Sequence, residues 1–193
     1  KLRLEHIDEL NAKLRELEAE IDKLLPPFDP DDLLERLDEI PGIDQTTAQI
    51  IVAEIGTDMA RFPNDKHLTA WAGLAPGTNE SAGRNRSART LKANRYLRPA
   101  LVQAAHAAGK TDTYLGERYR RLARRRGKKR AALAVARSML VIVYHLIRDG
   151  SRFIERGAAF FDQLNSPSTQ QWLTRRLERL GFKVILEPLE TAA

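Results

Sequence analysis

The sequence predicts a mainly α-helical protein, with an N-terminal coiled-coil helix, a helical domain containing a helix-hairpin-helix-like element, and a short helix-strand tail. Apolar residues recur at helical spacing through most of the chain, and proline, glycine and small polar residues gather between these runs. Of the 193 residues, 42% are hydrophobic, which is enough for a buried core. The absence of cysteine excludes disulfides and thiolate zinc sites and favours the reducing cytoplasm as the expected location.

Residues 1–25 are predicted to form one strand of a coiled coil. Their apolar residues alternate at spacings of three and four, at Ile7, Leu10, Leu14, Leu17, Ile21 and Leu24. Fewer than three heptads are marginal for a lone helix, so a partner helix is expected, from another subunit or from an upstream segment. The alternative is a surface helix folded back on its own domain. The start at Lys1 has no signal-peptide pattern and indicates a piece of a longer protein.

A proline-rich linker follows this helix. Pro26-Pro27 and Asp29-Pro30 end it, because proline cannot continue the helical hydrogen-bond ladder. Asp31 or Asp32 is expected to cap a short helix that carries Leu33, Leu34, Leu37 and Ile40.

The segment 40–48, Ile-Pro-Gly-Ile-Asp-Gln-Thr-Thr-Ala, resembles a helix-hairpin-helix. In such an element the backbone N–H groups of a glycine turn, here at Gly42, contact a phosphate. Asp44 stands where these hairpins often have a second glycine, and its carboxylate would repel phosphate unless it caps the second helix. Gly42 is therefore either a phosphate contact or part of a purely structural turn.

Further helices are predicted at 68–74, about 91–109, 112–126, 129–149 and 170–180, with Pro99 either kinking the second or marking its start. Gly181 is expected to stop the last helix, and 182–189 to form one strand. The longest apolar stretch, 131–147, contains Arg137 and His145 and is too short to span a bilayer, so no membrane contact is expected. The predicted organisation is a coiled-coil segment, 1–25, a linker and short helix, 26–37, the main domain, 38–150, and its tail, 151–193.

Charge is distributed unevenly along the chain. Residues 1–40 contain 6 Lys/Arg and 13 Asp/Glu, whereas residues 84–130 contain 16 Lys/Arg and 2 Asp/Glu. The central segment is where a polyanion such as nucleic acid would bind.

The most informative segment is the polar, glycine-containing loop 73–89, with Ser81 between small residues. Three arginines follow the serine, at Arg84, Arg86 and Arg89. A hydroxyl beside guanidinium groups suits attack on a phosphodiester, because arginine neutralises the charge that develops on the phosphate oxygens. The residues alone favour the alternative, in which Ser81 is a loop serine that stabilises a local backbone turn.

Two further sets of basic residues are candidate nucleic-acid contacts. The first set, if helical, would form one ridge: Lys92, Arg95 and Arg98. The second follows Arg118, Arg120 and Arg121 and consists of Arg124, Arg125, Arg126, Lys128, Lys129 and Arg130. Charge runs are often simply solvated, but this one is not balanced by acidic residues. If about 6 to 10 phosphates are neutralised, affinity should fall roughly 10³- to 10⁵-fold between about 50 and 200 mM salt.

The string GLAPGTNESAGRNRSARTLKANRYLR, residues 73–98, resembles the transposase domain of bridge-RNA-guided insertion-sequence recombinases. Shared features are the GL-x-P start, a serine among small residues and the K-x-N-R-Y-L-R string. The hairpin at 41–44, the Tyr144-His145-Leu146 helix and the 176–181 tail fit in order, so the resemblance covers essentially the whole chain. Glu80 and Pro99 depart from the common pattern; Glu80 either orients the serine hydroxyl or is an exposed loop carboxylate.

The resemblance implies a DNA transposase with two catalytic parts. A RuvC-like domain, not found in this sequence, would supply a DEDD carboxylate set for Mg²⁺, and no cofactor is expected in this chain itself. A coiled coil would mediate homo-oligomer assembly, Ser81 would become joined to DNA, and a guide (bridge) RNA would choose the DNA sequence. The chain alone is then expected to bind nucleic acid and to cut poorly.

Neither metal binding nor nucleotide hydrolysis is indicated by the residues. The acidic residues near 29–39 are explained by helix caps and helix faces, and the four histidines have no metal-ligand spacing. His145 is interpreted as a core side chain. No phosphate-binding glycine loop with a following lysine is present.

Two other functions are compatible with the sequence. One is a non-catalytic module that binds nucleic acid and joins subunits through the coiled coil. The other is a helix-hairpin-helix DNA-repair factor, which would prefer damaged or branched DNA without a guide.

Overall fold

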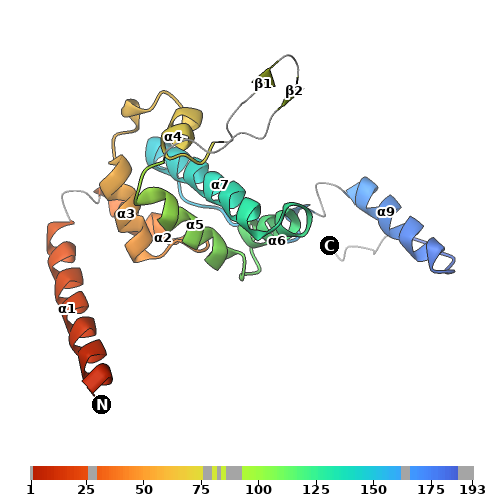
Figure 1. The fold of residues 1–193 in the computed structure, drawn as a ribbon. Coiled ribbons are helices and arrows are strands. Elements are labelled where there is room, and N and C mark those ends of the chain that lie inside the picture. The colour runs from red at the N-terminus through yellow and green to blue at the C-terminus, as the bar shows by residue number, and fades with distance from the viewer. Residues whose placement is uncertain are drawn as a thin grey trace, which may run out of the picture.

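A long helix, α7 (Lys128–Asp149), forms the centre of the structure (Figure 1). The computed structural model describes residues 2–25, 30–75, 80–81, 84–85, 93–161 and 166–186. The other elements in chain order are α1 (Leu2–Leu24), η2 (Pro30–Asp32), α2 (Leu33–Asp38), α3 (Gln45–Ile55), η3 (Met59–Arg61), α4 (Asp65–Trp71), β1 (Glu80–Ser81), β2 (Arg84–Asn85), α5 (Leu97–Ala108), α6 (Tyr114–Arg126) and α9 (Ser166–Arg179). The prediction of a mainly α-helical protein is confirmed.

The buried face of α7 carries alanines toward its N-terminal end and larger side chains toward its C-terminal end. It comprises Ala131, Ala132, Val135, Ala136, Met139, Leu140, Val143, Tyr144 and Leu146. Helix α7 packs against α2, α4, α5, α6 and η3. By length and composition α7 could also cross a membrane, but 50% of its most apolar stretch is buried in the protein, as in a core helix.

The buried guanidinium of Arg36 joins the C-terminal end of α7 to α2. Arg36 is only 7% exposed. It donates hydrogen bonds to the carbonyl oxygens of Leu146 at 2.7 Å and Ser151 at 2.8 Å. Carbonyls at a helix C-terminus carry partial negative charge, so they stabilise the buried cation.

The turn between α2 and α3 rests directly on α5. Gly42 in this turn has φ +90°, and a Cβ atom there would lie 2.3 Å from the carbonyl oxygen of Ala104 and 2.8 Å from the amide nitrogen of Ala108. Only glycine fits this backbone conformation at this distance from α5. The glycine hairpin therefore has a clear packing role in the structure.

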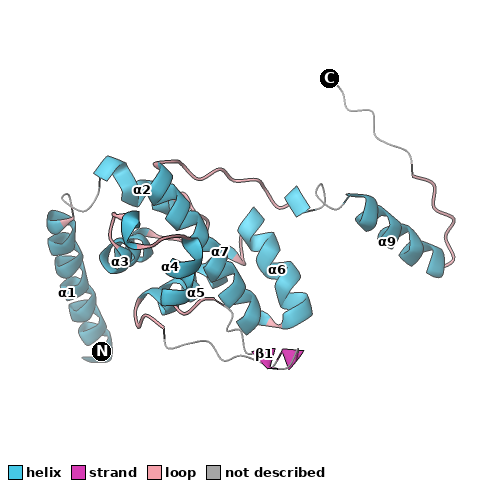
Figure 2. Ribbon diagram, turned by 90° about the horizontal axis from the view of Figure 1, so that it is seen from above, coloured by secondary structure: helices cyan, strands magenta, loops and turns pink. Residues whose placement is uncertain are grey.

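Helix α1 stands apart from the packed helices (Figures 1 and 2). The apolar residues of its predicted seam are all exposed, from 43% at Ile21 to 69% at Leu24. Exposed ion pairs link Lys13 to Glu9 and Lys23 to Glu20 along the helix. The alternative in which this helix folds back on its own domain is not what the structure shows.

Three local predictions are wrong. Asp31 and Asp32 do not cap α2; both have left-handed backbone angles, φ 54° and 53°, and the N-cap residue Asp32 makes no side-chain capping bond. The strand predicted at 182–189 is absent over 182–186, the part that the structure describes, because no neighbouring strand pairs with it. His145 is half-exposed and lies 3.5 Å from the Asp149 carboxylate, so it is not a core residue.

Replacing Gly42 by alanine should destabilise the fold by at least about 2 kcal/mol, because both the backbone angle and the contact with α5 oppose a side chain. Urea unfolding would measure this. Gly150→Ala is the matched control, since Gly150 also has a positive φ, +62°, but nothing within 4 Å of an added Cβ. We expect a loss of only about 1 kcal/mol there; equal losses in the two variants would contradict the packing role of Gly42.

Candidate nucleic-acid interface

The corner between α6 and α7 concentrates exposed positive charge. Gly127, with φ 82° and ψ 158°, is the single residue that separates the two helices. Six exposed cations flank it: Arg124, Arg125, Arg126, Lys128, Lys129 and Arg130. None of the six forms an ion pair with another residue in the described part of the chain. We refer to these six residues as the basic corner.

Helix stability does not account for all of the basic corner. Cations in the last turn of α6 interact favourably with the helix dipole, but cations in the first turn of α7 do not. Lys128, Lys129 and Arg130 lie in that unfavourable position. A bound anion would compensate for it, because the N-terminal amides of a helix also favour negative charge.

The three preceding arginines of α6 have structural partners. Arg120 donates from Nε to Glu117 at 3.0 Å and from Nη1 to the carbonyl of Thr111 at 2.7 Å. Arg121 donates from Nε to the other Glu117 oxygen at 2.9 Å, and Arg118 donates from Nη1 to the hydroxyl of Tyr114 at 3.3 Å. The structure thus divides the arginines of the sequence run into a structural group and the basic corner.

Glu117 is held in its ionised form by this arrangement. Partial burial alone would raise its pKa, but the hydrogen bonds from Arg120 and Arg121 outweigh that effect and hold the pKa below the ordinary glutamate value. Glu117 therefore keeps two guanidinium groups in place at neutral pH.

The loop that carries Ser81 runs from Gly73 to Ala93, and we refer to it as the serine loop. Its two ends meet on the helical body. A Cβ at Gly73, which has φ +68°, would lie 2.4 Å from the Cβ of Ala93. Next to Ala93, the side chain of Asn94 donates to Glu54 of α3 at 2.5 Å and accepts from the amide of Leu97 at 2.8 Å. The loop therefore leaves and rejoins the body at one fixed point.

Within the loop, β1 and β2 form a short antiparallel pair that stands apart from the helices in Figure 1. Ser81 is the register partner of Arg84, and Glu80 is the partner of Asn85. Directly opposed residues in such a pair have Cα atoms roughly 5 Å apart. The backbone thus brings together the predicted nucleophile and the first predicted arginine. Arg86, Arg89 and Lys92 lie outside the described residues.

The predicted basic ridge of Lys92, Arg95 and Arg98 is wrong in one respect. Helix α5 begins at Leu97, with Pro99 in its first turn, so Arg95 lies in the turn before the helix. The guanidinium of Arg95 lies 5.8 Å from the ring centroid of Tyr96. Pro99 marks the start of the helix and does not kink it, which was one of the two expected outcomes.

At the glycine hairpin, a carboxylate occupies the helix N-terminus where a phosphate would bind. Asp44 accepts the amide of Thr47 at 2.8 Å and so caps α3. Hydrogen bonds from the Thr47 side chain and backbone hold the pKa of Asp44 below its usual value, so it is ionised at neutral pH. This arrangement favours the structural role of Gly42 over phosphate contact.

Among the described residues, no group of three or more His, Asp or Glu side chains is placed to hold a metal ion. The carboxylate set that the resemblance implies for Mg²⁺ has no counterpart in this part of the chain. The described residues therefore do not fit a metal centre.

Residues 34–120 match the family described as Transposase IS116/IS110/IS902 family. The similarity is to IS110-type transposases. The matched region runs from α2 into α6 and includes the whole serine loop. The expected resemblance to a transposase is confirmed at this level.

Two curated relatives agree with this match. Over 151 residues, 76% of the chain, it is 31% identical to a Streptomyces coelicolor protein described as Insertion element IS110 uncharacterized 43.6 kDa protein. Over 121 residues, 61% of the chain, it is 30% identical to the Pilin gene-inverting protein of Moraxella bovis. The aligned parts cover 36% and 37% of these relatives, so the chain spans little more than a third of their length.

Sequence reasoning missed the residues that position the loop and the corner. Asn94 and Glu54 are 40 positions apart, and nothing in their spacing shows that they meet. The hydrogen bond from the Leu97 amide to Asn94 could have been predicted locally, because asparagine is a common capping residue just before the start of a helix. The pairing of Glu117 with Arg120 and Arg121 could also have been predicted, because residues three and four apart are neighbours on a helix surface.

Replacing Glu117 by glutamine should reduce the free energy of unfolding at pH 7 by about 1 kcal/mol, because the ion pairs with Arg120 and Arg121 are lost. A carboxylate with a lowered folded-state pKa stabilises above its unfolded-state pKa, and this contribution disappears as pH falls through the folded-state pKa. Urea unfolding at pH 7 and in acid should therefore show the difference from the parent shrinking in acid.

Glu35→Gln is the control for this series, since Glu35 is exposed on α2. It should change the free energy of unfolding by less than about 0.5 kcal/mol. A Glu117→Gln effect that stays constant with pH would contradict an electrostatic role.

Proposed function

We propose that the chain is the C-terminal portion of an IS110-type DNA transposase, in which Ser81 forms a covalent phosphoserine link to DNA. The observation that carries the proposal is the transposase-family match over residues 34–120, which contains the serine loop. The register pairing of Ser81 with Arg84 and the basic corner are the geometric support.

The proposed reaction is a transesterification. The Oγ atom of Ser81 attacks a DNA phosphorus, a P–O bond of the backbone breaks, and the cut strand leaves with a hydroxyl group. The proton of the serine hydroxyl passes to a base, and the leaving oxygen receives a proton. Arg84 would neutralise the negative charge that develops on the phosphate oxygens in the transition state.

A phosphoserine diester conserves the energy of the original bond. A hydroxyl of a second DNA strand can therefore attack the phosphoserine, re-form a phosphodiester and release Ser81. Strand exchange by this route needs no nucleotide hydrolysis.

The base belongs, in this proposal, to a RuvC-like domain in the rest of the protein, where bound Mg²⁺ would lower the pKa of a water or stabilise the phosphate charge. Among the described residues, no group of side chains is placed to hold that Mg²⁺. The chain by itself should then bind nucleic acid but cut poorly.

The basic corner is proposed to hold the phosphate backbone. Its lysines and arginines are exposed and unpaired within the described part of the chain, which suits contacts that carry no base information. A guide RNA is accordingly proposed as the source of sequence choice, through base pairing with the DNA. The recombination itself would take place on chromosomal DNA in the cytoplasm of a bacterium.

The exposed seam of α1 is proposed to pair with the same helix of another subunit. Its six apolar side chains, each at least 43% exposed, are a strong driving force for association. A homo-oligomer would bring two serine loops to two DNA molecules.

The alternative is a non-catalytic module that binds nucleic acid and joins subunits. It is favoured by the basic corner and by the α1 seam, neither of which depends on Ser81. The two functions differ in whether a covalent protein–DNA species exists.

In the full-length protein, Ser81→Ala should abolish both recombination and the covalent adduct with labelled donor DNA on a denaturing gel. The reason is that alanine has no oxygen with which to form the diester. Ser138→Ala is the matched control, because the Ser138 hydroxyl only donates to the carbonyl of Ala134 within α7. Recombination by the Ser81→Ala protein at the parental rate would reject the catalytic proposal in favour of the binding module.

Placing two carboxylates in the α1 seam, Leu10→Asp with Leu17→Asp, should convert the assembly to a monomer at micromolar concentration. Burying unpaired charges in a helix seam is strongly unfavourable. Analytical ultracentrifugation would measure the change. Ala12→Asp with Ala19→Asp adds the same charge opposite the seam and should leave the assembly intact; a parent chain that is monomeric throughout would contradict the proposal.

A further inference from the structure

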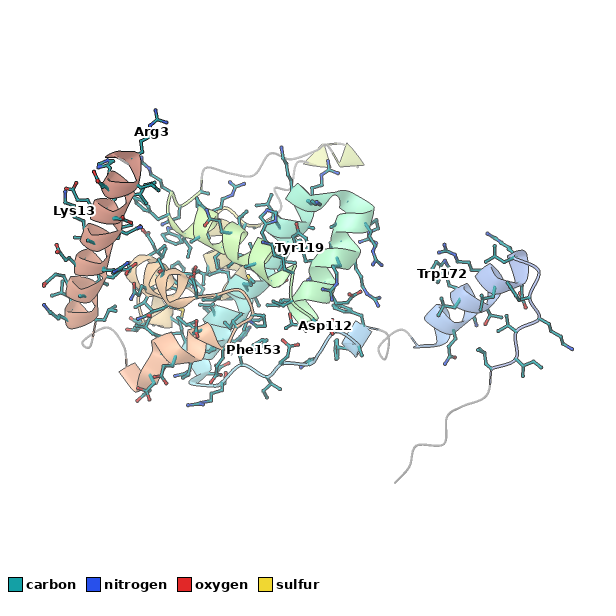
Figure 3. The ribbon with its side chains drawn as sticks, turned by 90° about the horizontal axis from the view of Figure 1, so that it is seen from below. Arg3, Lys13, Asp112, Tyr119, Phe153 and Trp172 are labelled. Atoms are coloured by element: carbon teal, nitrogen blue, oxygen red, sulfur yellow. The ribbon has the colours of Figure 1, made fainter. Side chains whose placement is uncertain are left out.

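Helix α9 lies apart from the packed helices and carries an exposed tryptophan, Trp172 (Figure 3). Trp172 is 57% exposed, and α9 makes no substantial packing contact with another described element. Tryptophan is among the most costly side chains to leave in water, so its position on an isolated helix calls for an explanation.

Three arginines share one side of α9 with this tryptophan. Arg175, Arg176 and Arg179 follow Trp172 at intervals of three, four and seven, which places all four residues on one helix face. The guanidinium of Arg176 lies 5.3 Å from the Trp172 ring centroid. Together with Gln171, these residues line a shallow groove of about 410 Å³. We refer to this face as the Trp172 ridge.

The Trp172 ridge has no acidic member. The single acidic residue of α9, Glu178, does not line the groove. Leu173 and Leu177 of the helix, and Leu180 just after it, follow a neighbouring stripe with spacings of four and three. None of these leucines lines the groove.

The end of α9 is fixed by its backbone. Gly181, with φ +89°, donates to the carbonyl of Glu178, and the amide of Phe182 donates to the carbonyl of Leu177. This is a Schellman motif, which satisfies the last carbonyls of the helix. Arg179 is thus held in the last helical turn, where positive charge also favours the helix dipole.

We propose that the Trp172 ridge is a binding site for single-stranded nucleic acid, with an unpaired base stacked on Trp172 and the flanking phosphates held by the arginines. An exposed aromatic ring among arginines is the combination that binds unpaired strands. A duplex cannot use the ring in this way, because its bases are already stacked. The proposal rests on the proposed nucleic-acid function and adds a second site, distinct from the basic corner, with a preference for unpaired strands.

The test uses the fluorescence of Trp172 in the 193-residue chain. The sequence contains two tryptophans, so Trp71→Phe leaves Trp172 as the reporter and keeps an aromatic ring beside Phe62, whose ring centroid lies 5.7 Å from that of Trp71. Single-stranded oligouridine should quench this fluorescence, and a fully paired RNA duplex of equal length should quench it much less.

Affinity measurements with the same two probes provide the second readout. Trp172→Ala should weaken binding of the single strand about tenfold and binding of the duplex less than about twofold, whereas Trp172→Phe should retain most of the single-strand affinity. Thr174→Ala, a change on the opposite side of α9, should alter neither.

Each contrary result has a distinct meaning. Equal losses for both probes, or no quenching by the single strand, would overturn the proposal while leaving the basic corner as a backbone-binding site. A Trp172→Ala variant that binds both probes normally but changes its sedimentation would identify the ridge as a protein interface and also overturn it. A parent chain that binds neither probe would overturn this inference and the proposed nucleic-acid function together.

Discussion

Burial of the apolar face of α7 is the interaction on which the rest of the structure depends. Helices α4, α5 and α6 all pack against α7. Removing the apolar side chains of α7 and of these neighbours from water provides the main stabilisation, since apolar burial dominates folding. The polar contacts at the C-terminal end, from Arg36 to Leu146 and Ser151, then fix where the chain leaves the core.

Both candidate surfaces are held by elements packed on α7. The serine loop begins after α4 and returns at Asn94, just before α5, and both helices contact α7. The basic corner is the junction of α6 with α7 itself. A rigid helical core thus positions a loop and a charged corner, which is the usual arrangement for sites whose chemistry resides in loops.

Periodicity predicted the helices well, because helix formation here is dominated by one apolar face for each helix. The residue types that usually mark the ends of helices and strands were a less reliable guide. Asp31 and Asp32 have the right residue type for capping, but the backbone before α2 turns left-handed, and the N-cap Asp32 makes no capping bond. The strand expected after Gly181 required a pairing partner, which hydrophobicity alone cannot supply.

The candidate site, like the fold, was predicted only in part, because several of its contacts form only in the folded protein. Sequence identified the serine loop and the arginine run, but not which arginines serve structure, because that depends on Glu117 and on the carbonyl of Thr111. The contact between Gly73 and Ala93, which closes the loop, is likewise a property of the folded backbone. Neither periodicity nor charge could name the type of protein; the resemblance of residues 73–98 indicated a transposase, and the family comparison agrees with it.

Gly127 has a consequence beyond separating two helices. It fixes six like charges at neighbouring positions on either side of one bend, so the unbound protein retains an internal repulsion that folding does not relieve. The repulsion is stronger when the helices are formed, because an unfolded chain holds the same charges further apart on average, so a polyanion would relieve more repulsion in the folded form. Nucleic acid would therefore act on this domain as a folding ligand, shifting the equilibrium between the folded and unfolded forms as well as occupying a surface.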